Sequence, residues 1–470
     1  MRDRAADSRR IATRRITLSF RTGHSGPHSE FGWNMPNTST TERPTAPPTA
    51  LTSVAVIGMG YVGLPTALGL LEGGVRVLGV DHSPERLRAI EARDVDLIEA
   101  DHRRLEKALY QDGFELTGDP ARLAEADAVM VCVPTPVDRY LLPDLGPLRS
   151  ACEALVRHAR PGQTLILTST SFVGTTRQML VEPLAARGLT AGRDVLVASS
   201  PERIDPGNVT HTQRETPRVL GGVTEDCAAS AARVIELLTP AVHRVASPEV
   251  AEMTKLYENT FRAVNIALAN EFADICSGLE LDPIEVIDAA RTKPYGFMAF
   301  NPGPGVGGHC IPCDPHYLLW QLRETRTAAP LVNQAMTSIA ERPRGVVDRA
   351  HEVLSDTGRG LGGARVLVVG VAYKPGVLDV RSSSALDIIE ELVRRGARVE
   401  YHDPLIPALA LPAGGALESV ARPGEGEWDL VLVHTVHPGH DYGWIGEGPL
   451  VVDATYRFRL ADGSRAGATP

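Results

Sequence analysis

The sequence has little cysteine, no long hydrophobic run and no excess of positive charge. Six cysteines in 470 residues do not make a disulfide framework and fit a reducing compartment, so we expect a cytoplasmic protein. No apolar run approaches the roughly 20 residues needed to cross a bilayer. A formal net charge of -10 argues against nucleic acid as the main partner. With 43% hydrophobic residues, the chain is long enough for two or three soluble domains.

The first fifty residues also lack a periodic apolar pattern. They are rich in Arg to about Arg21 and then in Ser, Thr and Pro, which predicts a disordered N-terminal extension over residues 1–50. An Arg- and Ser-rich start also resembles an organelle transit peptide, although Asp3 and Asp7 weaken that interpretation. Alternatively, Met35 is the true initiator, and a protein begun there keeps full activity. The polar tail from about Ala461 is expected to be frayed.

A strand, a glycine-rich turn and a helix open the ordered part of the chain. The apolar run at residues 53–57 leads directly into Gly58-Met59-Gly60-Tyr61-Val62-Gly63, and a second run at residues 75–80 ends in Asp81. In such a fingerprint the glycines allow close approach of a pyrophosphate, and the acid binds the ribose hydroxyls. A turn that binds nothing is the alternative. Since no Arg stands beside Asp81 to receive a 2′-phosphate, we predict NAD rather than NADP.

Polar residues follow three further apolar runs, at residues 128–133, 164–167 and 195–198. They are Thr135, Thr170 and Glu202, respectively. The ligand crevice of a doubly wound sheet lies at the carboxyl ends of its strands. We therefore expect these three side chains to converge on one edge of the sheet, although each alone is also ordinary turn chemistry.

A long helix and a second α/β unit come next. The helical pattern of residues 248–279 contains Lys255 and Asn259, which are four residues apart and so share a face. Strands are predicted at residues 365–370, 398–401, 430–434 and 450–453. The second unit carries Gly370-Val371-Ala372-Tyr373-Lys374-Pro375 where the first carries its glycine turn. The predicted class is α/β, with two Rossmann-like doubly wound domains joined by a long central helix and a helical dimerisation region.

Between the two units, residues 300–315 crowd glycine and proline around Cys310. This composition predicts a rigid loop whose backbone presses against a ligand while it presents the thiol. A buried structural cysteine is one alternative, and Cys310-x-x-Cys313 also has the spacing of a redox pair or half a zinc site. No second Cys/His pair at ligand spacing follows, which argues against zinc. A thioredoxin-like redox motif needs a strand before it, and the Gly/Pro run is incompatible with that strand. We favour a nucleophilic thiol, which needs a neighbouring base or a lowered pKa.

Taken in order, these blocks resemble the UDP-glucose/GDP-mannose dehydrogenase family, and within it the branch that oxidises UDP-N-acetylhexosamines at C6. The resemblance covers roughly residues 51 to 460. It rests on Gly58-x-Gly60-x-x-Gly63, Val133-Pro-Thr-Pro136, Ser169-Thr170, Gly174-Thr-Thr-Arg177, Ser200-Pro-Glu-Arg-Ile-Asp-Pro-Gly-Asn208, Lys255-x-x-x-Asn259, the Cys310 loop, Gly370-Val-Ala-Tyr-Lys374 and Asp379-x-Arg381-x-Ser383.

The resemblance implies a four-electron oxidation of a primary alcohol to a carboxylate with two NAD+ in succession. Cys310 would trap the aldehyde, and Lys255, with Asn259 beside it, would stabilise the oxyanion. Asp314 would orient water or Lys255, and Glu202 would act as general base in thioester hydrolysis. Thr135 would hold water or the cofactor.

The resemblance also implies binding roles and domains. The cofactor-binding residues would be Gly58, Gly60, Tyr61, Val62, Gly63, Asp81, Arg86, Thr135, Thr170 and Arg381. The substrate-binding residues would be Glu202, Arg203, Lys255, Asn259, Phe300, Gly305 and Lys374, the last on the UDP phosphates. The expected domains are an NAD-binding domain at residues 51–245, a central helical domain at 246–345 and a UDP-sugar-binding domain at 346–470. The long helix would be the spine of a homodimer, and no metal is expected.

Three positions depart from the pattern of UDP-glucose oxidisers. Pro206 and Cys313 stand where those enzymes often have Glu and Lys, and both changes resemble the N-acetylglucosamine branch. Leu378 replaces one of two paired acids near Arg381. The expected enzyme is a UDP-N-acetylglucosamine 6-dehydrogenase of polysaccharide synthesis, with UDP-N-acetylmannosamine or UDP-glucose oxidation as the alternatives. A non-catalytic nucleotide-binding redox sensor is a more distant alternative.

Overall fold

The computed structural model describes residues 51–97, 99–204, 212–308, 310–445, 449–459 and 467–470. The N-terminal extension predicted at residues 1–50, with Met35, lies outside the described residues. So do residues 205–208 of the Ser200 block, with Pro206, and residues 460–466 of the tail. None of the described helices is both long and apolar enough to cross a bilayer.

The first lobe is built on an eight-stranded sheet in the order β3-β2-β1-β4-β5-β6-β7-β8. Its strands are β1 (Ser53–Ile57), β2 (Arg76–Val80), β3 (Phe114–Thr117), β4 (Ala128–Val131), β5 (Thr164–Leu167), β6 (Leu196–Ser199), β7 (Arg218–Gly222) and β8 (Val242–Val245). All neighbours are parallel except β6 and β7. The strand order reverses between β1 and β4, so a cofactor crevice is expected at their carboxyl ends.

Helices cover both faces of this sheet because its central strands are apolar on both sides. In β1, Val54 and Val56 pack toward α1, α3 and α6, whereas Ala55 and Ile57 pack toward α4 and α5. The helical elements are α1 (Gly63–Glu72), α2 (Pro84–Glu91), α3 (Glu99–Leu109), η1 (Pro120–Glu125), α4 (Gly146–His158), η2 (Arg177–Val181), α5 (Glu182–Ala186) and α6 (Glu225–Ile235).

The second lobe contains a four-stranded parallel sheet in the order β10-β9-β13-β14. Its elements are β9 (Arg365–Val369), α11 (Ser384–Arg394), β10 (Arg398–His402), β11 (Ala408–Ala410), β12 (Ala416–Glu418), η3 (Pro423–Glu425), β13 (Leu430–Val433) and β14 (Leu450–Asp453). The expectation of a frayed tail is wrong for residues 467–470. Ala468 bridges to Val452, and the Tyr456 hydroxyl donates to the carbonyl of Pro470 at 2.7 Å.

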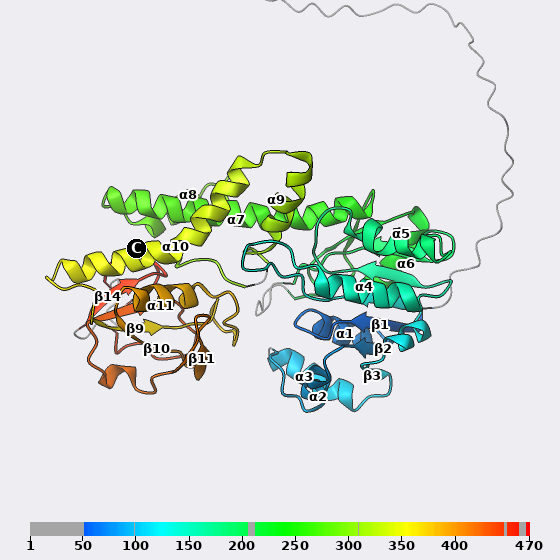
Figure 1. Ribbon diagram of the computed structural model, residues 1–470, viewed down its shortest axis with the longest axis horizontal. Coiled ribbons are helices and arrows are strands. Elements are labelled where there is room, and N and C mark those ends of the chain that lie inside the picture. Colours follow the sequence, from blue (N-terminus) through cyan, green and yellow to red (C-terminus); the bar gives the residue numbers. More distant parts are fainter. Residues whose placement is uncertain (1–50, 98, 205–211, 309, 446–448, 460–466) are drawn as a thin grey trace, which may run out of the picture. The chain divides into compact units, whose positions relative to one another are not determined.

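Four helices join the lobes: α7 (Pro248–Gly278), α8 (Pro283–Arg291), α9 (Asp314–Thr325) and α10 (Pro330–Ser355). Ser247 caps α7 by accepting from the N–H of Val250, and Pro248 occupies its first turn. Figure 1 shows α10 alongside α7 and against the second sheet. The predicted class, with two Rossmann-like sheets and a long central helix, is confirmed.

Buried Arg342 ties α10 to three other segments. Its guanidinium donates to the carbonyl of Gly303 at 3.1 Å, to Asp274 of α7 at 2.7 Å and to the hydroxyl of Tyr456. Because a guanidinium presents several donors in a fixed plane, one side chain sets the start of the cysteine loop, α7 and the second lobe against one another.

Glu252 attaches α7 to the first lobe. Its carboxylate accepts from the N–H of Gly174 at 2.6 Å, from the N–H of Thr176 at 2.8 Å and from the Thr176 hydroxyl at 2.6 Å. Burial raises the pKa of Glu252, although the bonds from Thr176 and Gly174 oppose that shift. The Gly174-Thr-Thr-Arg177 block is therefore where α7 is attached to the first lobe.

Replacing Glu252 by Ala should lower the free energy of unfolding by about 2–4 kcal/mol, because it leaves buried backbone donors without an acceptor. Urea denaturation measures the loss. Glu249→Ala is the matched control, since Glu249 contacts the same block through Arg177 at 2.8 Å but at the surface. That variant should lose about 0–1 kcal/mol. Equal losses in the two variants would show that Glu252 is not the anchor.

Candidate active site

The predicted glycine turn follows β1 directly. The N–H of Gly58 donates to the carbonyl of Val80 at 2.8 Å, and a side chain at Gly58 (φ +89°) would meet the carbonyl of Cys132. A Cβ at Gly63 would lie 1.7 Å from the carbonyl oxygen of Gly58. A Cβ at Gly60 would meet no atom within 4 Å. Packing thus explains Gly58 and Gly63, whereas Gly60 leaves open space above the backbone, which the close approach of a dinucleotide pyrophosphate would require.

Asp81 at the end of β2 holds this turn from the side. It accepts from the N–H of Met59 at 2.8 Å and from the N–H of Ser83 at 2.9 Å. Arg86, in the first turn of α2, donates to the carbonyl of Met59 at 2.8 Å. Both predicted cofactor residues therefore lie against the glycine turn, where a bound NAD would place its adenosine ribose beside Asp81.

Tyr61 connects this turn to the Asp379–Arg381 segment. Arg381 donates to both oxygens of Asp379, at 2.9 and 2.7 Å, and its guanidinium carbon lies 6.0 Å from the centroid of the Tyr61 ring. Burial, followed by the charges of Asp96 and Asp379, raises the pKa of Tyr61 to about 12. The predicted cofactor residue Arg381 thus reaches the glycine turn at Tyr61, the residue before Val62.

A buried polar cluster forms where α9 meets α7. Asn259 donates to Asp314, the first residue of α9, and Lys255 lies one turn earlier on the same face of α7. Burial raises the pKa of Asp314 to about 6, although the charge of Lys255 and the bond from Asn259 both lower it. All three side chains are at least nine-tenths buried. The predicted grouping of Lys255, Asn259 and Asp314 is present in the structure.

Cys310 is exposed and lies one turn before Asp314. Its carbonyl accepts from the N–H groups of Cys313 and Asp314, at 3.3 and 2.8 Å, so the thiol residue is attached to the start of α9. Cys313 is buried, and burial with the nearby charge of Asp314 raises its pKa to about 11. The two cysteines therefore differ, with one accessible thiol and one buried thiol that resists ionisation.

Tyr317 is a member of this site that sequence reasoning missed. It is fully buried, shares a hydrogen bond with the side chain of Thr135, and lies near Asp314 and Cys313, whose charges with burial raise its pKa. Its hydroxyl also donates to the carbonyl of Pro136 at 3.3 Å. The available signal was its spacing, because Tyr317 follows Asp314 by three residues and so shares its helix face.

Thr135, Thr170 and Glu202 follow the neighbouring strands β4, β5 and β6, as predicted. Glu202 forms a buried ion pair with Arg218 of β7 and accepts from the N–H groups of Arg203 and Ile204 at 2.8 and 3.1 Å. In the part of the chain that the structure describes, no hydrogen bond or ion pair joins Glu202 to Lys255, Asn259 or Asp314. Sequence reasoning missed Arg218.

Of the other predicted substrate residues, Arg203 contacts α7, whereas Phe300 and Gly305 belong to the loop that leads to Cys310. Arg203 pairs with Glu258 of α7, and Phe300 packs edge-on against Phe261 at 5.9 Å between ring centroids. A Cβ at Gly305 would lie 2.5 Å from the Cβ of Ser384 in the second lobe. A Cβ at Gly307 would lie 2.7 Å from the Cβ of Tyr373, the neighbour of Lys374. The two glycines therefore allow the loop that leads to Cys310 to pack closely against the second lobe, beside Lys374.

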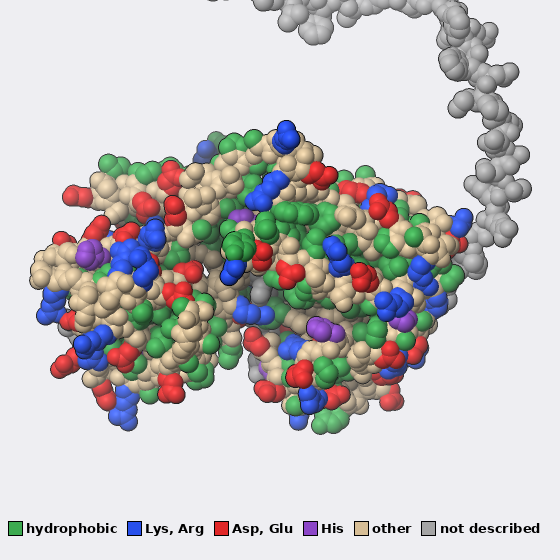
Figure 2. All heavy atoms as spheres, in the orientation of Figure 1, with side chains coloured by type: hydrophobic (Ala, Val, Ile, Leu, Met, Phe, Trp, Pro, Cys, Tyr) green, Lys and Arg blue, Asp and Glu red, His purple; other side chains and the backbone are tan. Residues whose placement is uncertain are grey.

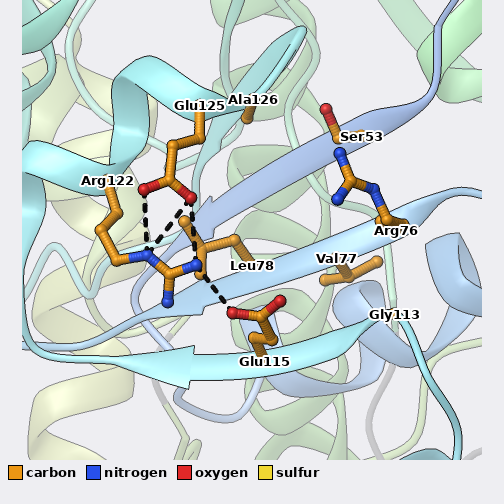
Figure 3. A pocket seen from close by; sticks show the side chains of 9 residues that line it. All are labelled: Ser53, Arg76, Val77, Leu78, Gly113, Glu115, Arg122, Glu125 and Ala126. Atoms are coloured by element: carbon orange, nitrogen blue, oxygen red, sulfur yellow. Dashed lines mark hydrogen bonds and ion pairs between the residues drawn. The ribbon is translucent and has the colours of Figure 1, made fainter.

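A small cavity lies at the opposite edge of the first sheet, at the amino ends of β1 and β2 (Figure 3). In it Arg122 donates to Glu115 at 2.7 Å and to Glu125 at 3.0 Å. Its volume of about 40 Å³ suits water rather than a nucleotide. Among the described residues, no group of three or more His, Cys, Asp or Glu is placed to hold a metal ion.

Comparison with known proteins identifies the family. Residues 52–239, 249–339 and 367–458 match the NAD binding, central and UDP binding domains, respectively, of the UDP-glucose/GDP-mannose dehydrogenase family.

Two curated relatives and one solved structure are similar over most of their length. A UDP-N-acetyl-D-mannosamine dehydrogenase of Campylobacter jejuni is 34% identical over 76% of this chain and 88% of its own. A UDP-N-acetyl-D-glucosamine 6-dehydrogenase of Pseudomonas aeruginosa is 32% identical over 82% and 90%. The solved UDP-D-ManNAc dehydrogenase of Pyrococcus horikoshii is 29% identical, covers 89% of this chain and 99% of its own, and has a TM-score of 0.80. The chain belongs to the UDP-glucose/GDP-mannose dehydrogenase family and is an NAD-dependent dehydrogenase of UDP-sugars.

Proposed function

We propose that the chain oxidises C6 of a UDP-N-acetylhexosamine, first of all UDP-N-acetylglucosamine, to the uronic acid. The observation that carries the proposal is the buried cluster of Lys255, Asn259 and Asp314, one helical turn from the exposed Cys310, whose carbonyl accepts from the N–H of Asp314. Similar proteins named for UDP-N-acetyl-D-glucosamine and UDP-N-acetyl-D-mannosamine support the N-acetylhexosamine class. UDP-N-acetylmannosamine is the second candidate, because its named relatives are equally similar.

We propose domain roles to match. Residues 51–245 hold NAD at the Gly58–Gly63 turn, residues 246–345 carry the chemistry, and residues 346–470 bind the UDP moiety, with Lys374 on its phosphates. Bound NAD+ accepts one hydride in each oxidation step, so two NAD+ are consumed per sugar. On the face that Figure 2 draws, acidic and basic side chains are interspersed, which suits a small anionic substrate better than a nucleic-acid strand.

The proposed catalytic residues can be assigned to successive steps of the reaction. Lys255, with Asn259, stabilises the oxygen that loses its proton as C6 becomes an aldehyde. Cys310 adds to the aldehyde carbon and forms a thiohemiacetal, which a second hydride loss converts to a thioester. Water then cleaves the carbon–sulfur bond, releasing the carboxylate and restoring the thiol. Glu202 is the proposed general base for that water, and Arg218 supplies the counter-charge that a buried carboxylate requires.

Purified protein with NAD+ and each of UDP-N-acetylglucosamine, UDP-N-acetylmannosamine and UDP-glucose should form two NADH per sugar, fastest with the first.

Cys310→Ala should stop uronic acid formation, because no thioester forms. Cys313→Ala is the matched control and should keep both hydride transfers, since its thiol is buried. Full turnover by Cys310→Ala would refute the thioester route, and a clear preference for UDP-glucose would refute the N-acetyl assignment. Formation of two NADH per sugar would exclude the non-catalytic redox sensor.

Activity should depend on the ionisation of Asp314, whose pKa lies at about 6. If the carboxylate orients Lys255 or water, it must be ionised, so kcat/KM should fall about tenfold per pH unit below pH 6. Asp314→Asn should remove this acidic limb and lower kcat on the order of a hundredfold. Asp144→Asn, at an exposed position, is the control and should keep the acidic limb of the pH profile. A limb that persists in Asp314→Asn would belong to another group.

We propose a homodimer along α7. Its exposed apolar residues recur at intervals of three, four or seven positions and so form one stripe along the helix, which Leu279 continues just after the helix ends: Val250, Met253, Tyr257, Phe261, Leu268, Phe272 and Ile275. A stripe on one straight helix can pair with itself about a two-fold axis, so a second copy of the chain is the expected occupant.

Placing a charge in this stripe should separate the subunits. Ile275→Asp should shift the protein from dimer to monomer in sedimentation equilibrium, because it buries an unpaired carboxylate at the contact. Leu331→Asp is the control, since Leu331 is equally apolar and 67% exposed but lies on α10. A wild-type monomer, or the same response from both variants, would rule out this interface.

A further inference from the structure

The second lobe repeats the glycine-and-acid arrangement of the first. Gly370 follows β9 and donates its N–H to the carbonyl of His402 at 2.8 Å, just as Gly58 donates to Val80. Asp403 follows β10 and accepts from the N–H of Val371 at 2.7 Å. The bond from Met59 to Asp81 at 2.8 Å is the counterpart in the first lobe.

The acid of the second lobe is enclosed, however. Asp403 is 2% exposed, and one oxygen accepts from the N–H groups of Leu405 and Ile406 at 2.8 and 3.1 Å. The other oxygen accepts from Val371 and contacts Nε2 of His437 at 3.2 Å. Burial alone would raise the pKa of Asp403, but the bonds from His437, Val371 and Leu405 outweigh it and lower the pKa. An acid held this way supports the protein and is not available to a ribose.

His437 holds the other end of the turn that follows β9, at residues 371–376. It is 1% exposed, and its Nδ1 accepts from the N–H of Gly376 at 3.0 Å. Since Nδ1 accepts, the ring proton lies on Nε2 and is donated to Asp403. Asp403 thus holds the start of the turn at Val371, and His437 holds its end at Gly376.

A neighbouring hydroxyl fixes the same turn from a third side. Thr435 donates through Oγ1 to the carbonyl of Ala372 at 2.8 Å, and its own carbonyl oxygen would lie 1.8 Å from a Cβ at Gly370. Gly376 has φ +74°, a conformation that glycine adopts without strain. The backbone on both sides of Lys374 is therefore set by buried side chains.

We propose that Asp403 and His437 are positioning residues for substrate binding: each fixes one end of the turn at residues 371–376, and together they hold Lys374 where the diphosphate of the UDP-sugar binds. Asp403 and His437 touch no ligand and act through the backbone of the turn. The inference rests on the proposed function, because Lys374 is there assigned to the phosphates. It predicts that these two residues govern affinity for UDP and leave the cofactor site unchanged.

Two variants of His437 separate the contacts of its ring. His437→Asn keeps an acceptor at the position of Nδ1, so the N–H of Gly376 stays paired while the contact with Asp403 is lost. His437→Gln keeps a donor near the position of Nε2 and loses the acceptor for Gly376. The measurements are the Kd of UDP by calorimetry, the Kd of NADH and the thermal midpoint, on the full chain, with Lys374→Met as the reference for loss of the phosphate contact.

His437→Gln should weaken UDP binding about tenfold, toward the value of Lys374→Met, because an unmet N–H releases the turn. His437→Asn should stay close to wild type, and NADH affinity should be unchanged in both. Unaltered UDP binding in His437→Gln, equal losses in both variants, or a parallel loss of NADH binding would each overturn the inference. Wild-type protein that binds no UDP would instead overturn the proposed function, and the inference with it.

Discussion

The contact between the first turn of α9 and the middle of α7 is the interaction on which the proposed active site depends. Asp314 accepts from Asn259 inside the protein and faces Lys255. Burying a carboxylate and an ammonium is costly unless each finds a partner, so the three side chains are stable there only as a set. Cys310 is attached to the same turn through its carbonyl. The backbone of the residue that carries the exposed thiol is thus attached to the helix turn that the buried polar cluster holds.

Helix α7 carries this constraint to both lobes. Glu252 precedes Lys255 by three residues, and its bonds to Gly174 and Thr176 seat this part of the helix on the first lobe. Toward the other end of the helix, Asp274 pairs with Arg342, which also holds Gly303 and Tyr456. A single helix therefore links the first lobe, the cysteine loop and the second lobe, because each attachment centres on one buried side chain, Glu252 or Arg342, that makes several hydrogen bonds.

The sequence predicts those parts of the site whose residues are adjacent in the chain. The glycine turn and the Lys255–Asn259 face follow from local pattern, because each depends on one strand–turn–helix unit or one helix. Arg218 could not be found in this way. It opens β7, whose sequence ends in two glycines and so has a weak strand signal. Those glycines are explained only by packing, since a Cβ at Gly221 would lie 2.0 Å from the carbonyl oxygen of Ser247.

Comparison of the glycine turns that follow β1 and β9 shows why only the first lobe suits a dinucleotide. Gly60 is the second residue after Gly58, and it leaves open space above the backbone. Ala372 is the second residue after Gly370, and it is buried with its carbonyl bound by Thr435. A pyrophosphate therefore has access to the main chain in the first lobe but not at the corresponding place in the second. Under the proposed function, a phosphate in the second lobe would be bound by a side chain that extends beyond the backbone of the turn, and Lys374, two residues further on, is the cation that we propose for this contact.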